Sequence, residues 1–146
     1  MQDDEKAKQF DFWLGDWDLT WGEKGRGRNQ IDKILDGKVI QEQFTSLPDD
    51  DTPPFVGRSL SVFNTKSEQW QQTWVDNQGG YLDFKGGMVG GKMILSRPAI
   101  IEGQSVQQRM VWHNIQANAL DWSWERSDDD GRTWQVLWAI HYKRRH

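Results

Sequence analysis

Hydrophobic and polar residues alternate along most of this chain, in short runs separated by clusters of Gly, Asp, Asn and Pro. Alternation with a period of two is typical of a strand with one buried face, because successive side chains of a strand point to opposite sides. Turn-forming clusters such as Gly22–Gly27 and Asp128–Gly131 mark where the runs end. The pattern predicts about ten strands: Trp17–Trp21, Arg28–Leu35, Val39–Thr45, Val56–Asn64, Trp70–Asp76, Tyr81–Phe84, Lys92–Arg97, Ser105–Ile115, Ala119–Ser127 and Trp134–Arg144.

No run has the longer apolar period of an amphipathic helix, and only Glu5–Leu14 is expected to form a short helix or plug. The 146 residues therefore predict a single all-β domain spanning residues 1–146. About ten strands joined by short hairpins favour an up-and-down antiparallel barrel, because closure of the sheet removes its exposed edges.

The alternation also predicts how neighbouring strands pair, because the apolar faces of both strands of a hairpin must lie on the same side. Aligning those faces gives the following opposed residues: Trp122 with Trp138, Trp124 with Val136, Met110 with Trp122, Trp112 with Leu120, Leu60 with Gln72, Val62 with Trp70, and Arg58 with Trp74.

Aromatic residues dominate the apolar part of the composition: ten Trp, six Phe and two Tyr, although only 36% of all residues are hydrophobic. A barrel of this size has room for one small ligand unless side chains fill it, and polar groups on its inner wall need partners. We therefore predict a cavity for a small hydrophobic or aromatic molecule, including one with an anionic group. The predicted ligand-binding residues are Gln72, Trp74, Gln108, Trp112, Trp124, Trp138, Tyr142 and Arg144.

Charge and cysteine content exclude several function classes. The formal net charge of −4 is spread along the chain, which argues against a nucleic-acid-binding protein. The absence of cysteine excludes a disulfide scaffold, a thiol nucleophile and a thiolate metal site. No apolar run approaches the roughly 18 residues of a membrane span, and the polar residues Met1–Lys8 do not resemble a signal peptide. A cytoplasmic location is therefore expected.

The segment Phe10–Trp17, FDFWLGDW, contains Gly15-Asp16-Trp17 at the start of the first predicted strand. It resembles the Gly-x-Trp motif of the calycins, which include lipocalins and fatty-acid-binding proteins. That resemblance implies a barrel in which Trp17 closes one end under a stacked arginine, here Arg144 or Arg145. With Trp74–Asn77, Ser127–Trp134 and Tyr142–Arg144, the pattern resembles a bacterial lipocalin-like family of unknown function, which implies the barrel but no activity.

Two further motifs have a structural and a functional interpretation. Ser127–Trp134 reads S-x-D-x-G-x-T-W, the Asp-box of sialidase-type propellers, and is expected to be a hairpin turn rather than a calcium site. Tyr142 and Arg144 share one strand face and resemble, in reversed order, the Arg-x-Tyr pair that holds a ligand carboxylate in fatty-acid-binding proteins. Stacking of Arg144 on Trp17 is the competing interpretation.

The histidines do not indicate a metal or haem site. His113 and His141 fall on outward strand faces, and no two histidines have the spacing of a metal site. Haem-binding nitrobindins offer a minor alternative, since Gly22–Gly27 is similar to their glycine-rich stretch, but Asn29–Ile31 departs from the sequence that should follow. No metal or cofactor is predicted.

Two other functions stay open. An isomerase, cyclase or hydrolase would use the same cavity with Asp76 or Glu42 as the acid–base group. Alternatively, aromatic side chains fill the barrel, and the protein acts through its surface or as a homodimer. The apolar outward positions for such contacts are Val111, Ile115, Leu137 and Ala139.

Overall fold

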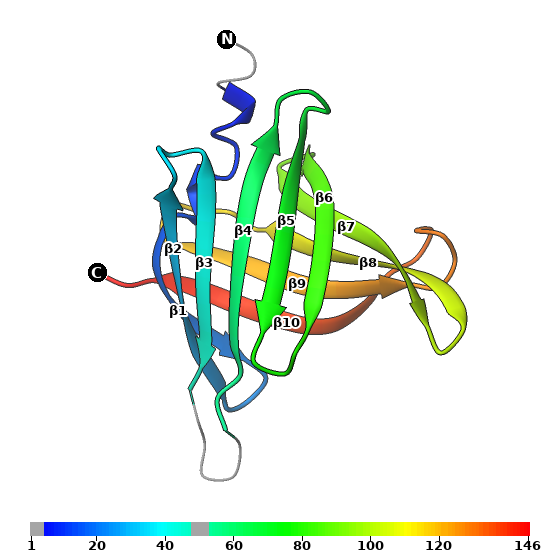
Figure 1. Ribbon diagram of the computed structural model, residues 1–146. Helices are drawn as coiled ribbons and strands as arrows, with labels where there is room; N and C mark the ends of the chain where they lie inside the picture. The colour runs from blue at the N-terminus through cyan, green and yellow to red at the C-terminus, as the bar shows by residue number, and fades with distance from the viewer. Residues whose placement is uncertain (1–4, 48–52) are drawn as a thin grey trace.

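Ten antiparallel strands form a closed barrel in the computed structural model, which describes residues 5–47 and 53–146 (Figure 1). The strands are β1 (Gly15–Trp21), β2 (Gly25–Ile34), β3 (Val39–Ser46), β4 (Val56–Asn64), β5 (Gln69–Asp76), β6 (Tyr81–Val89), β7 (Lys92–Ile101), β8 (Gln104–His113), β9 (Ala119–Ser127) and β10 (Gln135–Arg144). Each strand pairs with the next, and β1 also pairs with β10. The predicted all-β, up-and-down barrel is confirmed.

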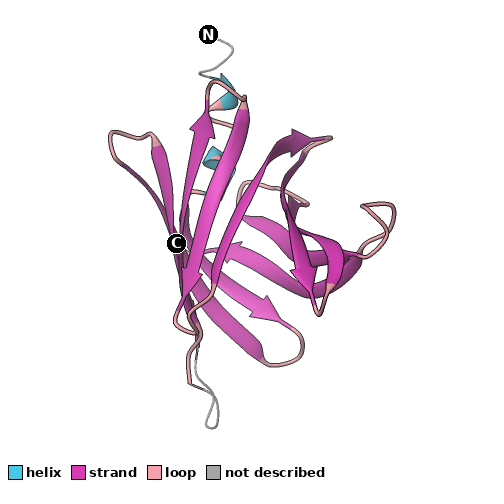
Figure 2. Cartoon of the chain, turned by 45° about the vertical axis from the view of Figure 1, so that its right-hand side comes forward, coloured by secondary structure: helices cyan, strands magenta, loops and turns pink. Residues whose placement is uncertain are grey.

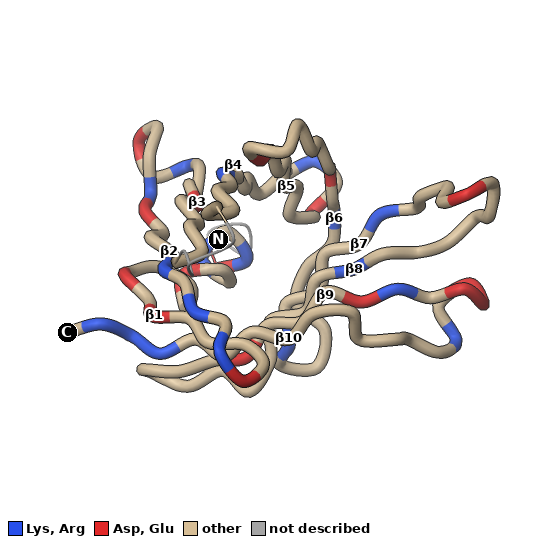
Figure 3. Tube along the Cα trace, turned by 90° about the horizontal axis from the view of Figure 1, so that it is seen from below, with Lys and Arg blue, Asp and Glu red and all other residues tan. Residues whose placement is uncertain are grey.

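The barrel wall is uneven at β6 and β7, which are both longer than predicted. β5 pairs with β6 over Tyr81–Gly86, whereas β7 pairs with β6 only over Lys85–Val89. At this crossing Gly86 passes close to β7, where a Cβ atom would overlap the carbonyl of Ile94. The distal part of β7 therefore pairs with β8 alone, and this hairpin projects from the barrel beside the end of β9–β10 (Figure 3).

The N-terminal segment plugs one end of the barrel, as expected for Glu5–Leu14. It contains the 3₁₀ helix η1 (Asp11–Trp13) and lies at the top of the barrel in Figure 2. Phe10 and Trp13 are almost completely buried and meet Trp112 of β8 at ring-centroid distances of 4.9 and 5.2 Å. These aromatic contacts fill the barrel at this end.

Next to the plug, Arg144 closes the barrel over Trp17. Its guanidinium lies 4.2 Å from the centroid of the Trp17 ring, and its Nη1 donates to the Leu14 carbonyl at 2.7 Å. Gly15 has φ +126°, and a Cβ atom there would overlap Nη1 of Arg144. The glycine of the Gly-x-Trp segment is therefore needed both for the backbone conformation and for the arginine. The stacking predicted for Arg144 or Arg145 is confirmed for Arg144, since Arg145 faces Asp18 at 3.5 Å.

The predicted register of the C-terminal hairpins is wrong by two residues, but the inward faces are right except at Val136. Trp138 lies opposite Trp124, and Ile140 lies opposite Trp122. At the irregularity between Val136 and Trp138 the register changes by one residue. A β-bulge of this kind turns one residue out of the alternation, and Val136 is accordingly exposed. In β8–β9 the observed pairs are Met110 with Trp124 and Trp112 with Trp122.

The predicted register of β4–β5 is wrong by one residue, which reverses the face of β4. Ser61 lies opposite Gln72, Phe63 opposite Trp70, Ser59 opposite Trp74, and Arg58 opposite Val75. Leu60 and Val62 therefore face solvent. The turn decides this register: Asn64 pairs with Gln69 across four residues, and Asn64 Oδ1 accepts the N–H groups of Lys66 and Ser67.

Candidate functional site

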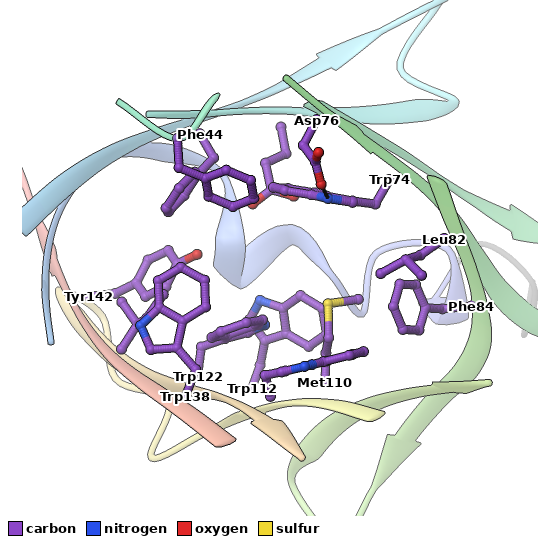
Figure 4. Close-up of a pocket in the computed structure, with 14 residues that line it drawn as sticks. Phe44, Trp74, Asp76, Leu82, Phe84, Met110, Trp112, Trp122, Trp138 and Tyr142 are labelled. Carbon is purple, nitrogen blue, oxygen red and sulfur yellow. Dashed lines mark hydrogen bonds between the residues drawn. The ribbon is translucent and has the colours of Figure 1, made fainter. Parts of the chain in front are cut away.

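An aromatic cavity of about 200 Å³ lies inside the barrel next to the N-terminal plug (Figure 4). Nine aromatic residues line it: Phe44, Phe55, Trp74, Phe84, Trp112, Trp122, Trp124, Trp138 and Tyr142. Leu82, Met110 and Ile140 add aliphatic surface, and Glu42 and Asp76 are the charged residues of the lining. Trp112 and Tyr142 connect the cavity to the plugged end, because they contact Phe10 and Trp17.

The structure brings five of the eight predicted ligand-binding residues to this cavity: Trp74, Trp112, Trp124, Trp138 and Tyr142. Both catalytic candidates, Glu42 and Asp76, also line it. The wall residues that were not predicted include Leu82 and Phe84, which the alternation in Tyr81–Phe84 could have placed on one face. Phe55 precedes β4 in a loop, where no periodicity indicates its direction.

Gln72, Gln108 and Arg144 do not line the cavity. Gln72 is buried and donates through Nε2 to Ser61 Oγ at 2.9 Å, while Gln108 Oε1 accepts a hydrogen bond from Arg97 at 2.7 Å. Arg144 is two residues beyond Tyr142, which moves it about 6.6 Å along the strand, and it is engaged over Trp17. The pair formed by Tyr142 and Arg144 therefore does not build the predicted anion clamp.

A buried polar network surrounds Glu42. Its Oε1 accepts the Ser59 hydroxyl and its Oε2 accepts Asn29 Nδ2, both at 2.7 Å. Asn29 Nδ2 also donates to the Tyr142 hydroxyl oxygen at 2.9 Å. Burial raises the pKa of Glu42, and the hydrogen bonds from Ser59 and Asn29 and the charge of Arg58 only partly oppose it. Burial and the neighbouring Glu42 likewise raise the pKa of Tyr142.

Asp76 has a different role at the edge of the cavity. Its Oδ2 accepts the indole N–H of Trp74 at 2.9 Å, and its Oδ1 accepts the backbone N–H groups of Gln78 and Gly80. Burial alone would raise the pKa of Asp76, but these hydrogen bonds together lower it. Asp76 therefore fixes the β5–β6 turn and the orientation of Trp74, and the dashed line in Figure 4 marks the bond to the indole.

The Asp-box segment forms a hairpin turn, as predicted. Asp129 Oδ1 accepts the Ser127 hydroxyl and the Thr133 N–H, both at 2.8 Å, and Oδ2 accepts the Thr133 hydroxyl at 2.6 Å. The hydrogen bonds from Thr133 and Ser127 lower the pKa of Asp129 to about 2. The adjoining Trp134 lies under the Arg109 guanidinium at 3.9 Å, away from the cavity.

The described residues contain no group of three His, Asp or Glu side chains that could hold a metal ion. His141 is exposed and its Nδ1 lies 2.7 Å from Asp121 Oδ1. No histidine lines the cavity in the described part of the chain, so these residues do not fit the axial ligation on which the haem alternative depends.

The four outward apolar positions do not form a common exposed surface. Val111 is buried and Ile115 packs against the core, whereas Leu137 and Ala139 are exposed. The homodimer stays a prediction. Within residues 5–47 and 53–146, no helix is long and apolar enough to cross a membrane.

Comparison with known proteins adds no assignment: no family model and no curated protein matches the chain. The function is therefore inferred from the geometry of the cavity.

Proposed function

We propose that this protein binds small, flat hydrophobic molecules of one or two aromatic rings inside the barrel. The observation that carries the proposal is the cavity of about 200 Å³ with nine aromatic residues in its wall. Apolar cavities of about 150 Å³ accept benzene, and sites for drug-sized ligands begin at about 300 Å³. The cavity volume therefore favours a ligand between these sizes. The barrel and the stacking of Arg144 on Trp17 also support a relationship to the calycins.

The cavity wall is suited to flat ligands because its aromatic rings are held by neighbours before a ligand arrives. Trp138 meets Trp122 edge-to-face at 5.7 Å, and Phe84 meets Trp124 in the same manner at 5.8 Å. The indole of Trp74 is fixed by its hydrogen bond to Asp76. Ordered side chains lose little conformational entropy on binding, and large aromatic surfaces gain from contact with a planar ligand.

Calorimetric titration of the protein with naphthol tests this function. We expect Trp124→Leu and Trp138→Leu to weaken binding about tenfold or more, because each removes a wall of the cavity; tenfold corresponds to about 1.4 kcal/mol. Trp134→Leu is the matched control, since Trp134 contacts Arg109 outside the cavity. Unchanged affinity in folded Trp124→Leu and Trp138→Leu proteins, judged by circular dichroism, would overturn the proposal.

A second candidate function is acid–base catalysis by Glu42. It is favoured by one observation: a carboxyl group with a raised pKa lies in the wall of an apolar cavity, linked through Asn29 to the Tyr142 hydroxyl. If a ligand found by titration is also converted, Glu42→Gln should abolish turnover and leave binding of that ligand measurable. Turnover that survives in Glu42→Gln would exclude this role.

A further inference from the structure

The charged residues of the cavity wall all have the same sign. Glu42 and Asp76 line the cavity, and no Lys, Arg or His does so within the described residues. A wall with only acidic charged residues is unfavourable for an anionic ligand, because a buried anion needs a cation or several N–H donors beside it.

Three arginines of the barrel strands have partners outside the cavity. Arg144 is held at the plugged end by Trp17 and the Leu14 carbonyl. Arg58 extends along the outside of β4, where its Nη1 donates to the carbonyls of Gly57 and Phe44. Arg97 bonds to the Asp83 carbonyl and to Gln108. None of these guanidinium groups is left to receive a carboxylate within the cavity.

The aromatic wall attracts positive charge. The face of an indole or phenyl ring is electronegative, and a cation within about 6 Å of it gains about 0.5 to 2 kcal/mol, at the upper end when water is excluded. Trp122 and Trp138 meet at an interplanar angle of 88°, so that the two indoles form a corner of the cavity. Asp76 places a carboxylate behind Trp74 by accepting its N–H, which adds negative potential on that side (Figure 4).

Glu42 supplies the counter-charge at the polar part of the wall. Its two oxygens each accept one hydrogen bond, from Ser59 and Asn29, which leaves lone pairs for a further donor. Tyr142 lies beside this network, and its hydroxyl points into the cavity in Figure 4. Within the apolar wall the Glu42 carboxylate is poorly solvated, and a bound cation would relieve that cost.

From these observations we infer that the ligand is a cation: an amine or quaternary ammonium group on a flat apolar body, with the cationic group paired to Glu42 inside the aromatic wall. The inference deepens the proposed function and rests on it. It replaces the anionic group expected from the sequence with a group of the opposite charge.

Three probes of similar size and different charge test the inference by calorimetric titration. Benzyltrimethylammonium is the cation, neopentylbenzene is its neutral isostere, and phenylpropanoate is the anion. We expect the cation to bind about tenfold more tightly than the neutral isostere, and the anion to bind most weakly. Glu42→Gln should remove most of the cation's advantage and leave affinity for neopentylbenzene unchanged. Glu125→Gln is the matched control, because Glu125 is a buried carboxylate that pairs with Arg109 outside the cavity.

The outcomes separate the two proposals. If neopentylbenzene binds as tightly as the cation, or phenylpropanoate binds best, the inference is wrong while the proposed function stands. If the cation is preferred equally by the wild-type and Glu42→Gln proteins, the assignment of Glu42 is wrong. If none of the three probes binds to the folded protein, the proposed function fails and the inference fails with it.

Discussion

Removal of the Arg144 side chain should destabilise the barrel, because this guanidinium holds the plugged end closed over Trp17. The guanidinium contacts the buried Trp17 ring at 4.2 Å, which is worth about 0.5 to 2 kcal/mol. It also donates to the carbonyls of Leu14 at 2.7 Å and Ala117 at 3.1 Å, and hydrogen bonds from a charged donor contribute about 1.5 kcal/mol or more each. Because solvent screens part of these terms, we expect Arg144→Ala to lower the free energy of unfolding by about 3 kcal/mol.

Urea unfolding, followed by tryptophan fluorescence and circular dichroism, measures this loss. With a slope of about 2 kcal/mol per molar urea, the midpoint should fall by about 1.5 M. Arg144→Lys should lose about half as much, because an ammonium group keeps the charge but not the planar fork. Arg145→Ala, which removes only an exposed contact with Asp18, should shift the midpoint by less than about 0.3 M. If the urea midpoint of Arg144→Ala also shifts by less than about 0.3 M, the closing role of Arg144 is refuted.

Three further predictions concern the Asp-box turn, the packing around Trp74 and the burial of Glu42. The folded-state pKa of Asp129 is about 2, below its ordinary 3.8, so its contribution to stability is complete above about pH 4 and is lost as pH falls toward 2. Unfolding measured across this pH range should show this loss of stability in the wild type but not in Asp129→Asn, and the same pH profile in both proteins would contradict the assignment. A Cβ atom at Gly57 would overlap the Trp74 ring, so Gly57→Ala should weaken naphthol binding in calorimetry. Gly87→Ala is the control, because a Cβ atom there meets open space, and equal affinities in the two variants would count against Trp74 as part of the binding wall. Burial raises the pKa of Glu42 above its ordinary 4.5, so its contribution to stability is full below that pH and declines as pH rises through the folded-state pKa. In urea unfolding, Glu42→Gln should therefore gain stability relative to wild type as pH rises above 4.5, and a relative loss would show that Glu42 is stabilised as a carboxylate.

The fold was predictable because strand alternation and turn residues recur along the whole chain. Val56–Asn64 and Ala119–Ser127 were predicted with the boundaries that the structure shows. Register was less predictable, since it depends on turn geometry and bulges that alternation does not report. The four-residue turn after Asn64 reversed the face of β4, and the bulge between Val136 and Trp138 changes the β9–β10 register by one residue.

The aromatic half of the site followed from the same alternation, whereas its polar half did not. The alternation of side chains along each strand was sufficient to place Trp124 and Trp138 in the cavity wall. The same alternation placed Arg144 on the inward face, but alternation does not indicate how far along the barrel axis a side chain lies. Arg144 lies at the plugged end. The network around Glu42 joins β2, β3, β4 and β10, and no local pattern in the sequence indicates that Asn29 meets Tyr142.

Fluorine NMR of fluorotryptophan-labelled protein tests ligand binding inside the barrel most directly, because the ten tryptophans divide into two groups. Five indoles line the cavity: Trp74, Trp112, Trp122, Trp124 and Trp138. After assignment by single substitutions, addition of naphthol should shift the resonances of these five and leave that of Trp134 on the outer surface unchanged. A shift confined to Trp134, or no shift at saturating naphthol, would contradict a ligand-binding cavity inside the barrel.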